Sequence, residues 1–578
     1  MTQSADHEVD LLVVGSGNGG LTAALCAYEF GVKDVLIVEK SEKFGGTSAT
    51  SGGVVWAPCN RYARKAGVTD SFEAARAFLR QTIPAGLVPS ELLDTYVHEA
   101  SRMIDFLHER TRVKYRPLAN VPGAPELRSL EPEPLNRSEL GAETSNLRDS
   151  HRFHCIFDRI TMTTGEALAL MTRVRGWRTV LFRLLWTHFS DVPWVLTHRR
   201  SRRVACGAAG IARLRLSLMD RKIPLWLNSA LDDLIADNAG QVVGASITRN
   251  GQRVVVRARR GVILAAGGFE HNQAMRERYL PKPTNFEWSA GAGTNCGDAL
   301  RAALSLGAQT RLMSGAYFCS TYHTPDHRVP WHAIIDKPHP GSCVVNRAGK
   351  RIANESSHFI EFQLELFRKH TESEPQVPTW MIFDARFRRR YLVGPIYNSR
   401  LRPDWSLPKS YFSSGLLTRA RTIEELARKT GIDPHGLDHT VALMNDYAKS
   451  GRDRDFHRGE TEYDRAFGDP TVKPNPSLAP IAVPPFYAIR IEPGDIGTQG
   501  GLDTDTHARV LNRKGEAIVG LYAIGNCAAA LCPTYPTGGC TLGPAMTFGW
   551  QAARHIARVS DVTTGNAKPT SEEFGHVD

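Results

Sequence analysis

The chain has 578 residues, of which 42% are hydrophobic and 23% charged, and its 71 Lys and Arg against 60 Asp and Glu give a formal charge of +11. These values are typical of a folded globular protein and exclude a disordered, collagen-like or coiled-coil chain. Because a single core of this size would be unusually large, we expect two or more domains.

The N-terminal residues and the cysteines favour a cytoplasmic protein. Residues 1–10 are polar, without a basic start followed by an apolar stretch, and no later run of about 20 uncharged apolar residues occurs. The ten cysteines include no C-x-x-C pair and no Cys/His cluster of the zinc-binding kind. We therefore expect reduced thiols, no metal site and no membrane-spanning segment.

Residues 10–39 have the pattern of a dinucleotide-binding βαβ unit. The predicted elements are a strand at 11–14, a helix at 21–30 and a strand at 35–38. The first strand ends in Gly15-x-Gly17-x-x-Gly20, and the second ends in Glu39. Gly15 allows a tight turn, Gly17 lets the backbone approach a pyrophosphate, and Gly20 lets the helix pack on the strand. Glu39 is expected to accept hydrogen bonds from a ribose.

A second run of small residues, 45–53, follows this unit directly. Its glycines alternate with hydroxyl side chains. Such a run can pass close under a flat ring system while its backbone N–H groups donate hydrogen bonds. The βαβ unit does not distinguish NAD from FAD, whereas this run favours a flavin.

Most of the excess positive charge lies in one insert, 168–203. Between 173 and 203 there are eight Arg and one acid, Asp191, so this stretch carries +8 − 1 = +7 of the total +11. Apolar residues recur in it at helical spacing, which predicts an amphipathic helix that Pro193 ends or kinks. That stripe comprises Val174, Trp177, Val180, Leu181, Leu184, Leu185 and His188/Phe189.

We expect this stripe to enter the acyl boundary of a membrane, with Arg and Trp at headgroup level. A partner or oligomer contact and an ordinary core helix are the alternatives. Nucleic acid is not expected, because no reading module accompanies the segment.

Two later strands complete the nucleotide-binding pattern. A buried strand at 261–264 ends in Gly267 and Gly268, and another at 520–524 ends in Gly525, ahead of a last helix that opens at 543–549. A nucleotide fold assembled from both ends of the chain implies a domain inserted between them.

Together these motifs resemble the flavoproteins of the fumarate reductase/3-ketosteroid dehydrogenase group, and most closely the 3-ketosteroid dehydrogenases. The matching segments are 10–60, 265–269, 351–356, 485–488, 493–501 and 525–549. The resemblance implies noncovalent FAD and an α/β fold, in which a discontinuous Rossmann-like FAD-binding domain (1–285 and 489–578) carries an inserted α+β catalytic domain (286–488). It also implies dehydrogenation next to a ketone. The residues expected to bind FAD are Gly15, Gly17, Gly20, Glu39, Lys40, Gly46, Thr47, Ser48, Gly52, Gly53, Ala266, Gly267, Gly525, Asn526, Thr541 and Leu542.

The segment 533–543 suits the polarisation of a ketone. Making a C=C beside a carbonyl needs hydrogen-bond donors at the carbonyl oxygen, a base for the α-proton and a hydride acceptor, which is the flavin. The Tyr535 hydroxyl and the Gly539 N–H can converge on one oxygen. The resemblance gives the same role to both, because the family binds the 3-keto group with Tyr and Gly at these positions.

At the position expected for the general base, this chain differs from the family pattern. The family's catalytic Tyr lies three residues after Asn-Glu-Ser, where this chain has Phe359, and its helper Tyr falls where this chain has residues 122–126. Replacements for the base are Tyr115, Tyr317, Tyr322 and His358, and the sequence does not choose among them.

Several functions stay open. Δ1-dehydrogenation of a 3-ketosteroid is favoured, and Thr537 leaves the Δ4 reaction possible. A smaller cyclic ketone and a non-catalytic, membrane-docked flavin protein are further alternatives. A fumarate-type reductase is disfavoured, because residues 533–549 contain no Arg to bind a dicarboxylate. We expect electrons to pass to a quinone or another acceptor, and the protein to lie on the cytoplasmic face of the cell membrane.

Overall fold

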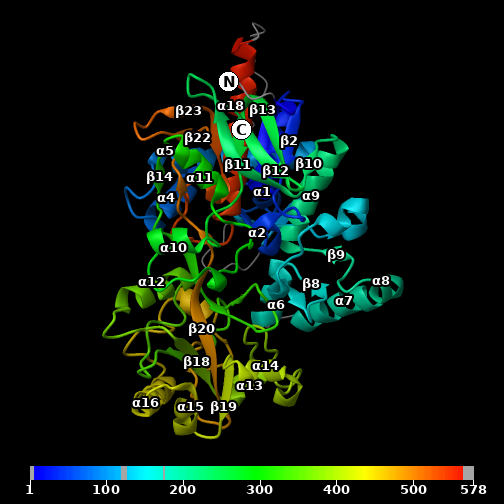
Figure 1. The fold of residues 1–578 in the computed structure, drawn as a ribbon. Helices are drawn as coiled ribbons and strands as arrows, with labels where there is room; N and C mark the ends of the chain where they lie inside the picture. The colour runs from blue at the N-terminus through cyan, green and yellow to red at the C-terminus, as the bar shows by residue number, and fades with distance from the viewer. Residues whose placement is uncertain (1–4, 119–126, 173–175, 564–578) are drawn as a thin grey trace.

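The structure, a computed structural model, describes residues 5–118, 127–172 and 176–563. Two main sheets lie toward opposite ends of the molecule (Figure 1). The first and last regular elements, β1 (His7–Val14) and α18 (Leu542–Thr563), lie together at the end that holds the first sheet.

The first sheet is built from both ends of the chain. Its other strands are β2 (Val35–Val38), β10 (Leu225–Trp226), β11 (Ser229–Ala236), β12 (Val242–Arg249), β13 (Gln252–Leu264), β22 (Arg509–Leu511) and β23 (Ala517–Ala523). The order is β10-β2-β1-β13-β12-β11, and β23 pairs in parallel with the last residues of β13. The C-terminal strand therefore completes a sheet that the N-terminal strands begin.

Alternate residues of β1 enter two different cores. Leu11 and Val13 pack among residues of α1 (Asn18–Glu29), α5 (Ser90–Arg110), α9 (Cys206–Asp220) and α18. Leu12 and Val14 pack in a second core with residues of α11 (Asp298–Ser305). Both faces of the sheet are covered, which explains why its parallel strands are continuous apolar runs.

The second sheet is antiparallel and is centred on the long strand β20 (Phe486–Thr498). Its other strands are β15 (Ala316–Tyr322), β16 (Trp331–His332), β17 (Ser342–Val345), β18 (Thr379–Phe383) and β19 (Leu417–Ala420). The helices that lie between its strands along the chain include α12 (Phe359–Lys369), α15 (Ile423–Thr430), α16 (Pro434–Ser450) and α17 (Glu462–Ala466). The expected fold class is confirmed, while the boundary expected between 488 and 489 falls inside β20.

The basic insert forms α6 (Thr164–Thr172), α7 (Trp177–Phe189) and α8 (Val192–Thr197), of which α7 and α8 project from the side of the molecule (Figure 1). Pro193 lies in the first turn of α8, where its missing N–H leaves no helical hydrogen bond unmade. The chain therefore breaks before the proline. Residues 173–175, with two of the eight Arg, lie outside the described residues.

The apolar stripe that we expected to enter a membrane packs inward. Leu184 and His188 are buried, and Val180, Leu181 and Leu185 are partly buried against a small core that α6 and α7 share with β8 (Ile160–Thr161). The prediction of the exposed face was wrong, because helical spacing identifies a stripe but does not say whether protein or solvent covers it.

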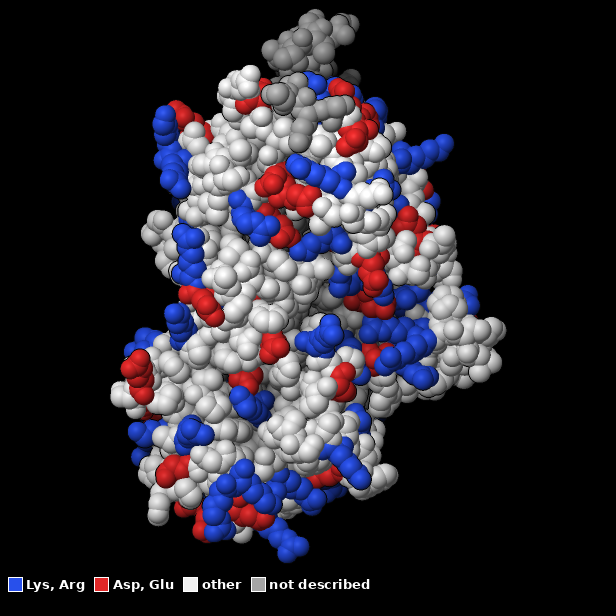
Figure 2. Space-filling model, viewed as in Figure 1, with Lys and Arg blue, Asp and Glu red and all other residues white. Residues whose placement is uncertain are grey.

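An apolar set that includes Phe189 of the expected stripe faces outward from α7 and α8. Its members are between 54% and 80% exposed: Phe182, Trp186, Phe189, Val192 and Leu196. Figure 2 shows that the projecting end of this insert is largely uncharged and that Lys and Arg gather beside it.

Within residues 5–118, 127–172 and 176–563, no helix combines the length and apolarity needed to cross a membrane. All ten cysteines are free thiols. In the same part of the chain, no group of three or more His, Cys, Asp or Glu side chains is arranged to hold a metal ion.

Candidate active site

The turn between β1 and α1 requires glycine at two positions. Gly15 has a φ of +109°, and a Cβ on it would lie 2.3 Å from the carbonyl oxygen of Ala265. A Cβ on Gly20 would lie 2.3 Å from the carbonyl oxygen of Gly15. Gly17, the N-cap of α1, brings no side chain over the helix N-terminus. The positive end of the helix dipole is thus open to an anionic group such as a diphosphate.

Glu39 ends β2 beside this turn and is held there by hydrogen bonds. One carboxylate oxygen accepts from the Ser16 hydroxyl at 2.6 Å and from the Ser16 N–H at 3.2 Å, and the other accepts from the Ser41 N–H at 2.9 Å. The next residue, Lys40, pairs with Asp298 at 2.5 Å.

The second run of small residues forms α2 (Gly46–Thr50), which is tied to two distant segments. Thr47 Oγ1 accepts hydrogen bonds from the Ala292 N–H at 2.9 Å and from Asn295 Nδ2 at 3.1 Å. Ser48 Oγ donates to Asn18 Oδ1 at 3.0 Å. These contacts bring the run against the start of α1.

The C-terminal part closes the same region. The Ile524 N–H donates to the Leu264 carbonyl at 2.9 Å, and the Ala266 N–H donates to Cys527 Sγ at 3.0 Å. Asn18 Nδ2 donates to the Leu542 carbonyl at 3.3 Å. Segments more than 500 residues apart in the chain thus meet at one place.

These segments line one cavity of about 420 Å³. Every residue that we expected to bind FAD lies on its wall. Part of the remaining wall is apolar and comes from several segments of the chain: Leu118, Phe153, Leu168, Ile334, Ile335, Phe359, Phe467 and Ile496. The first half, rich in backbone and small side chains, fits a dinucleotide, and the second half fits an apolar molecule.

Tyr535 lines this wall, and Gly539 lies next to it. The Gly539 N–H donates to the Tyr535 hydroxyl, so the two groups lie within hydrogen-bond distance of each other. Burial is the main cause that raises the pKa of Tyr535 to about 12, which keeps its proton in place at neutral pH. Gly539 has a φ of +102°, and a Cβ on it would lie 2.4 Å from the Trp56 nitrogen.

Two of the four residues that we expected as candidates for the general base lie away from the cavity. The Tyr115 hydroxyl donates to Met546 Sδ at 3.4 Å inside the first core. The Tyr322 hydroxyl donates to Met381 Sδ at 3.9 Å inside the core of the second sheet. Neither residue lines the cavity, so neither can reach a proton of a bound substrate.

The other two candidates, Tyr317 and His358, do line the cavity. The Tyr317 ring lies edge-on to the Tyr535 ring, with centroids 5.7 Å apart. His358 caps α12, where its Nδ1 accepts from the Ile360 N–H at 3.3 Å, and it also hydrogen-bonds to the Tyr535 backbone carbonyl. Mainly because it is buried, the pKa of His358 falls to about 4.

Sequence reasoning missed Tyr463 and three histidines on the same wall. Tyr463 lies on α17, with its ring 5.6 Å from the His358 ring. His151 and His154 reach the cavity from the segment 151–154, and His332 reaches it from β16. No local signal marks them, since they belong to no motif and meet only in the folded chain.

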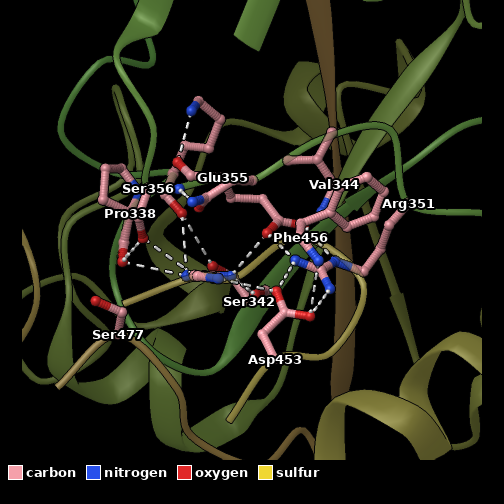
Figure 3. A network of polar contacts seen from close by, with 12 residues as sticks. Pro338, Ser342, Val344, Arg351, Glu355, Ser356, Asp453, Phe456 and Ser477 are labelled. Atoms are coloured by element: carbon pink, nitrogen blue, oxygen red, sulfur yellow. Dashed lines mark hydrogen bonds and ion pairs between the residues drawn. The ribbon is translucent and has the colours of Figure 1, made fainter. Parts of the chain in front are cut away.

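A buried ionic network explains the segment 351–356 (Figure 3). Glu355 accepts hydrogen bonds from Arg351 at 2.6 and 2.9 Å, from Arg458 at 3.2 Å and from the Val344 N–H at 3.1 Å. Arg351 also pairs with Asp453 at 2.8 Å. Burial alone would raise the pKa of Glu355, but the two guanidinium groups lower it to about 2.

Arg458 extends this network to the neighbouring loop. It donates to the carbonyl oxygens of Pro338, His339 and Ser342, at 3.1, 2.9 and 2.7 Å (Figure 3). Because α12 begins four residues after Glu355, the network fixes where the start of this helix enters the cavity wall.

The fold and the cavity define a class of flavoproteins. The family model described as FAD binding domain matches residues 10–542 of the chain. A buried polar atom also fits a ligand in this cavity: Thr537 Oγ1, on its wall, has no hydrogen-bond partner within the described residues. The expected cofactor, FAD, is confirmed.

Comparison with individual relatives shows to which family of flavoproteins the chain belongs. The 3-oxosteroid 1-dehydrogenase of Mycobacterium tuberculosis is 38% identical, over 95% of this chain and 98% of its own. The 4-oxocyclohexanecarboxylate 2-dehydrogenase of Sinomonas cyclohexanicum is 34% identical, over 95% and 92%. A crystal structure of the 3-ketosteroid Δ1-dehydrogenase from Sterolibacterium denitrificans, in complex with 1,4-androstadiene-3,17-dione, has a TM-score of 0.91 and 41% identity, over 96% of this chain and 100% of that one. The chain belongs to the 3-ketosteroid dehydrogenase family of FAD-dependent oxidoreductases.

Proposed function

We propose that this chain dehydrogenates a 3-ketosteroid and introduces a C=C at the Δ1 position. The observation that carries the proposal is that Tyr535, whose hydroxyl accepts from the Gly539 N–H, lies on the wall of the cavity that the expected FAD-binding residues also line. The relatives named as 1-dehydrogenases support Δ1 over Δ4.

The two donors acidify the substrate. A ketone oxygen that accepts from both Tyr535 and Gly539 gains negative charge as the α-proton leaves, and hydrogen bonds to that oxygen strengthen as the charge grows. Bound FAD supplies the acceptor for the hydride of the β carbon. The apolar wall excludes water from the reacting carbons.

Phe359 has no hydroxyl and cannot take a proton. We propose that Tyr463 accepts the proton instead. His358 is poorly suited, since both of its ring nitrogens are engaged. Tyr317 is only 3% exposed, within an apolar cluster, and has no route for releasing a proton. Tyr463 is half-buried, and burial and then the Glu361 carboxylate raise its pKa. Its oxygen can take the α-proton while its own proton is released to solvent at the exposed side of the half-buried ring.

A smaller keto acid is the second candidate, which the Sinomonas relative favours. A carboxylate in the cavity would need a cation. Among the described residues, no Arg lies on the cavity wall, and its Lys40 is paired with Asp298. An anionic substrate would therefore be left unpaired, which supports the steroid over this acid and over a dicarboxylate.

Product analysis tests this proposal. The FAD-loaded enzyme is incubated with androst-4-en-3-one and an artificial electron acceptor, and the product is examined by NMR. We expect a new C1=C2 double bond. Turnover of 4-oxocyclohexanecarboxylate but not of the steroid would contradict the proposal.

We further propose that the enzyme binds the inner face of the cell membrane through α7 and α8 and passes electrons to a quinone. The outward apolar set on these helices and the neighbouring Arg side chains match a surface of acyl chains and anionic headgroups. A substrate and an acceptor that both dissolve in lipid would make such a position useful.

A further inference from the structure

The histidines of the cavity wall form a compact group beside the apolar surface. The His151 ring stacks on the His332 ring with centroids 5.5 Å apart. The Phe153 ring lies between its neighbours, 4.4 Å from His332 and 5.3 Å from His154. The proposed chemistry at the ketone uses none of these residues.

Their hydrogen-bonding states differ. His151 is engaged, because its Nδ1 accepts from the Phe153 N–H at 3.1 Å and its ring also bonds to the Pro330 carbonyl. His154 is only 8% exposed, and its Nδ1 has no hydrogen-bond partner within the described part of the chain. A buried, unpartnered ring nitrogen on a cavity wall points to a ligand that completes it.

The group lies away from the ketone-binding residues. His332 pairs with Thr321 across β16 and β15, so the two side chains share one face of the sheet. Tyr317 is four residues before Thr321 on the same face, which separates the two positions by roughly 13 Å at about 3.3 Å per residue. Because the Tyr317 ring contacts Tyr535, His332 and the ketone site occupy opposite ends of this strand, and His154 is linked to His332 through the Phe153 ring that contacts both.

The charge state of the histidines limits the ligand. Burial is the main cause that lowers the pKa of His154 to about 3 and that of His332 to about 4. Both rings are therefore neutral near pH 7, and each has one N–H donor and one acceptor nitrogen. A neutral carbonyl or hydroxyl matches such groups, whereas a carboxylate does not.

We propose that His154 and His332 form a second polar subsite, which binds a neutral oxygen on the end of the substrate opposite the ring ketone. This inference rests on the proposed function and narrows its substrate class. The favoured substrates are fused-ring 3-ketones that carry a carbonyl or hydroxyl on the far ring, rather than a long alkyl chain.

Two steroids that differ in one oxygen test the subsite. The FAD-loaded enzyme is assayed with androst-4-ene-3,17-dione and with androst-4-en-3-one, as the wild type and as His154→Phe. We expect the wild type to prefer the dione by about fivefold or more in kcat/KM. In His154→Phe this preference should vanish while kcat/KM for the monoketone stays within about twofold.

The controls separate the possible failures. His439→Phe, at an exposed position on α16, should keep the wild-type ratio. His332→Phe provides a second variant if His154→Phe does not bind FAD. A ratio near one in the wild type, or an unchanged ratio in the variants, would overturn the subsite alone. Failure to oxidise either steroid would contradict the proposed function, and the subsite with it.

Discussion

Phe359 is the residue at which this chain departs from its family, and it leaves the cavity without the expected phenol. Three tyrosines and a histidine remain around the ketone site: Tyr317, Tyr463, Tyr535 and His358. His358 hydrogen-bonds to the Tyr535 backbone, and the Tyr317 ring packs against the Tyr535 ring. In the proposed mechanism, Tyr535 donates to the ketone and Tyr463 takes the proton.

Removing one hydroxyl at a time tests this assignment. We expect Tyr463→Phe to lower kcat by about 100-fold, because general base catalysis contributes on that scale. It should also slow the exchange of the α-proton with deuterated water. The matched variant Tyr317→Phe should change both rates less than about threefold. The reverse order of effects would mean that Tyr317 is the base.

For single residues, the sequence predicted the cofactor-binding positions better than the catalytic ones. Gly15 and Gly20 are marked by a local turn whose geometry admits no side chain. Tyr463 and His154 carry no such mark, because their role depends on segments that meet only after folding. Tyr115 and Tyr322 were plausible by position alone and lie in cores instead.

Among the secondary-structure elements, helix α12 has its start positioned by the ionic network around Glu355. This carboxylate pairs with two buried guanidinium groups, and removing its charge would leave Arg458 without its carboxylate partner and Arg351 with Asp453 alone. We expect Glu355→Gln to lower the free energy of unfolding by about 3 kcal/mol or more, measured by urea denaturation at pH 7. Glu425→Gln, at a solvent-exposed helix pair, should leave it nearly unchanged.

The pH dependence of this effect has a defined sign. The pKa of folded Glu355 lies below that of an unfolded glutamate, so its stabilisation is complete at neutral pH. It is lost as the pH falls from the unfolded value toward about 2. The difference between the wild type and Glu355→Gln should therefore shrink below about pH 4.5. A difference that grows on acidification would contradict this role.

The helices α7 and α8 carry the proposed membrane surface. We expect Phe182→Ser combined with Trp186→Ser to weaken binding to anionic phospholipid vesicles by at least about tenfold, because both side chains lose their apolar burial. Trp405→Ser, at a position 87% exposed elsewhere, is the control and should bind as the wild type does. Co-sedimentation at low and high salt measures the effect. Equal sedimentation of the double variant and the wild type would contradict the proposal.

The same helices show what an amphipathic pattern can predict. The spacing of apolar residues in the insert predicted a helix and its apolar stripe, but the stripe was expected to face a membrane and instead packs inward, and the outward set that includes Phe182 and Trp186 was not predicted. The insert also packs on β8, an element that periodicity did not reveal. A one-dimensional pattern identifies a face, whereas the tertiary packing decides what covers it.

In the whole molecule, the cavity joins two sheets with different tasks. The first sheet, completed by β23, presents the turns that hold FAD. The second sheet, the insert and the segment 151–154 supply apolar wall residues and histidines. Tyr535 lies between β23 of the first sheet and α18, on the wall that the second sheet also lines. The length and the split nucleotide pattern were enough to predict this architecture.

Anaerobic reduction of the flavin tests the central claim most directly. The FAD-loaded enzyme, without any electron acceptor, is titrated with androst-4-ene-3,17-dione while the flavin absorbance is recorded. We expect the oxidised flavin band to bleach as one equivalent of steroid is consumed, and 4-oxocyclohexanecarboxylate to leave it unchanged. A band that no 3-ketosteroid bleaches would contradict the proposed reaction.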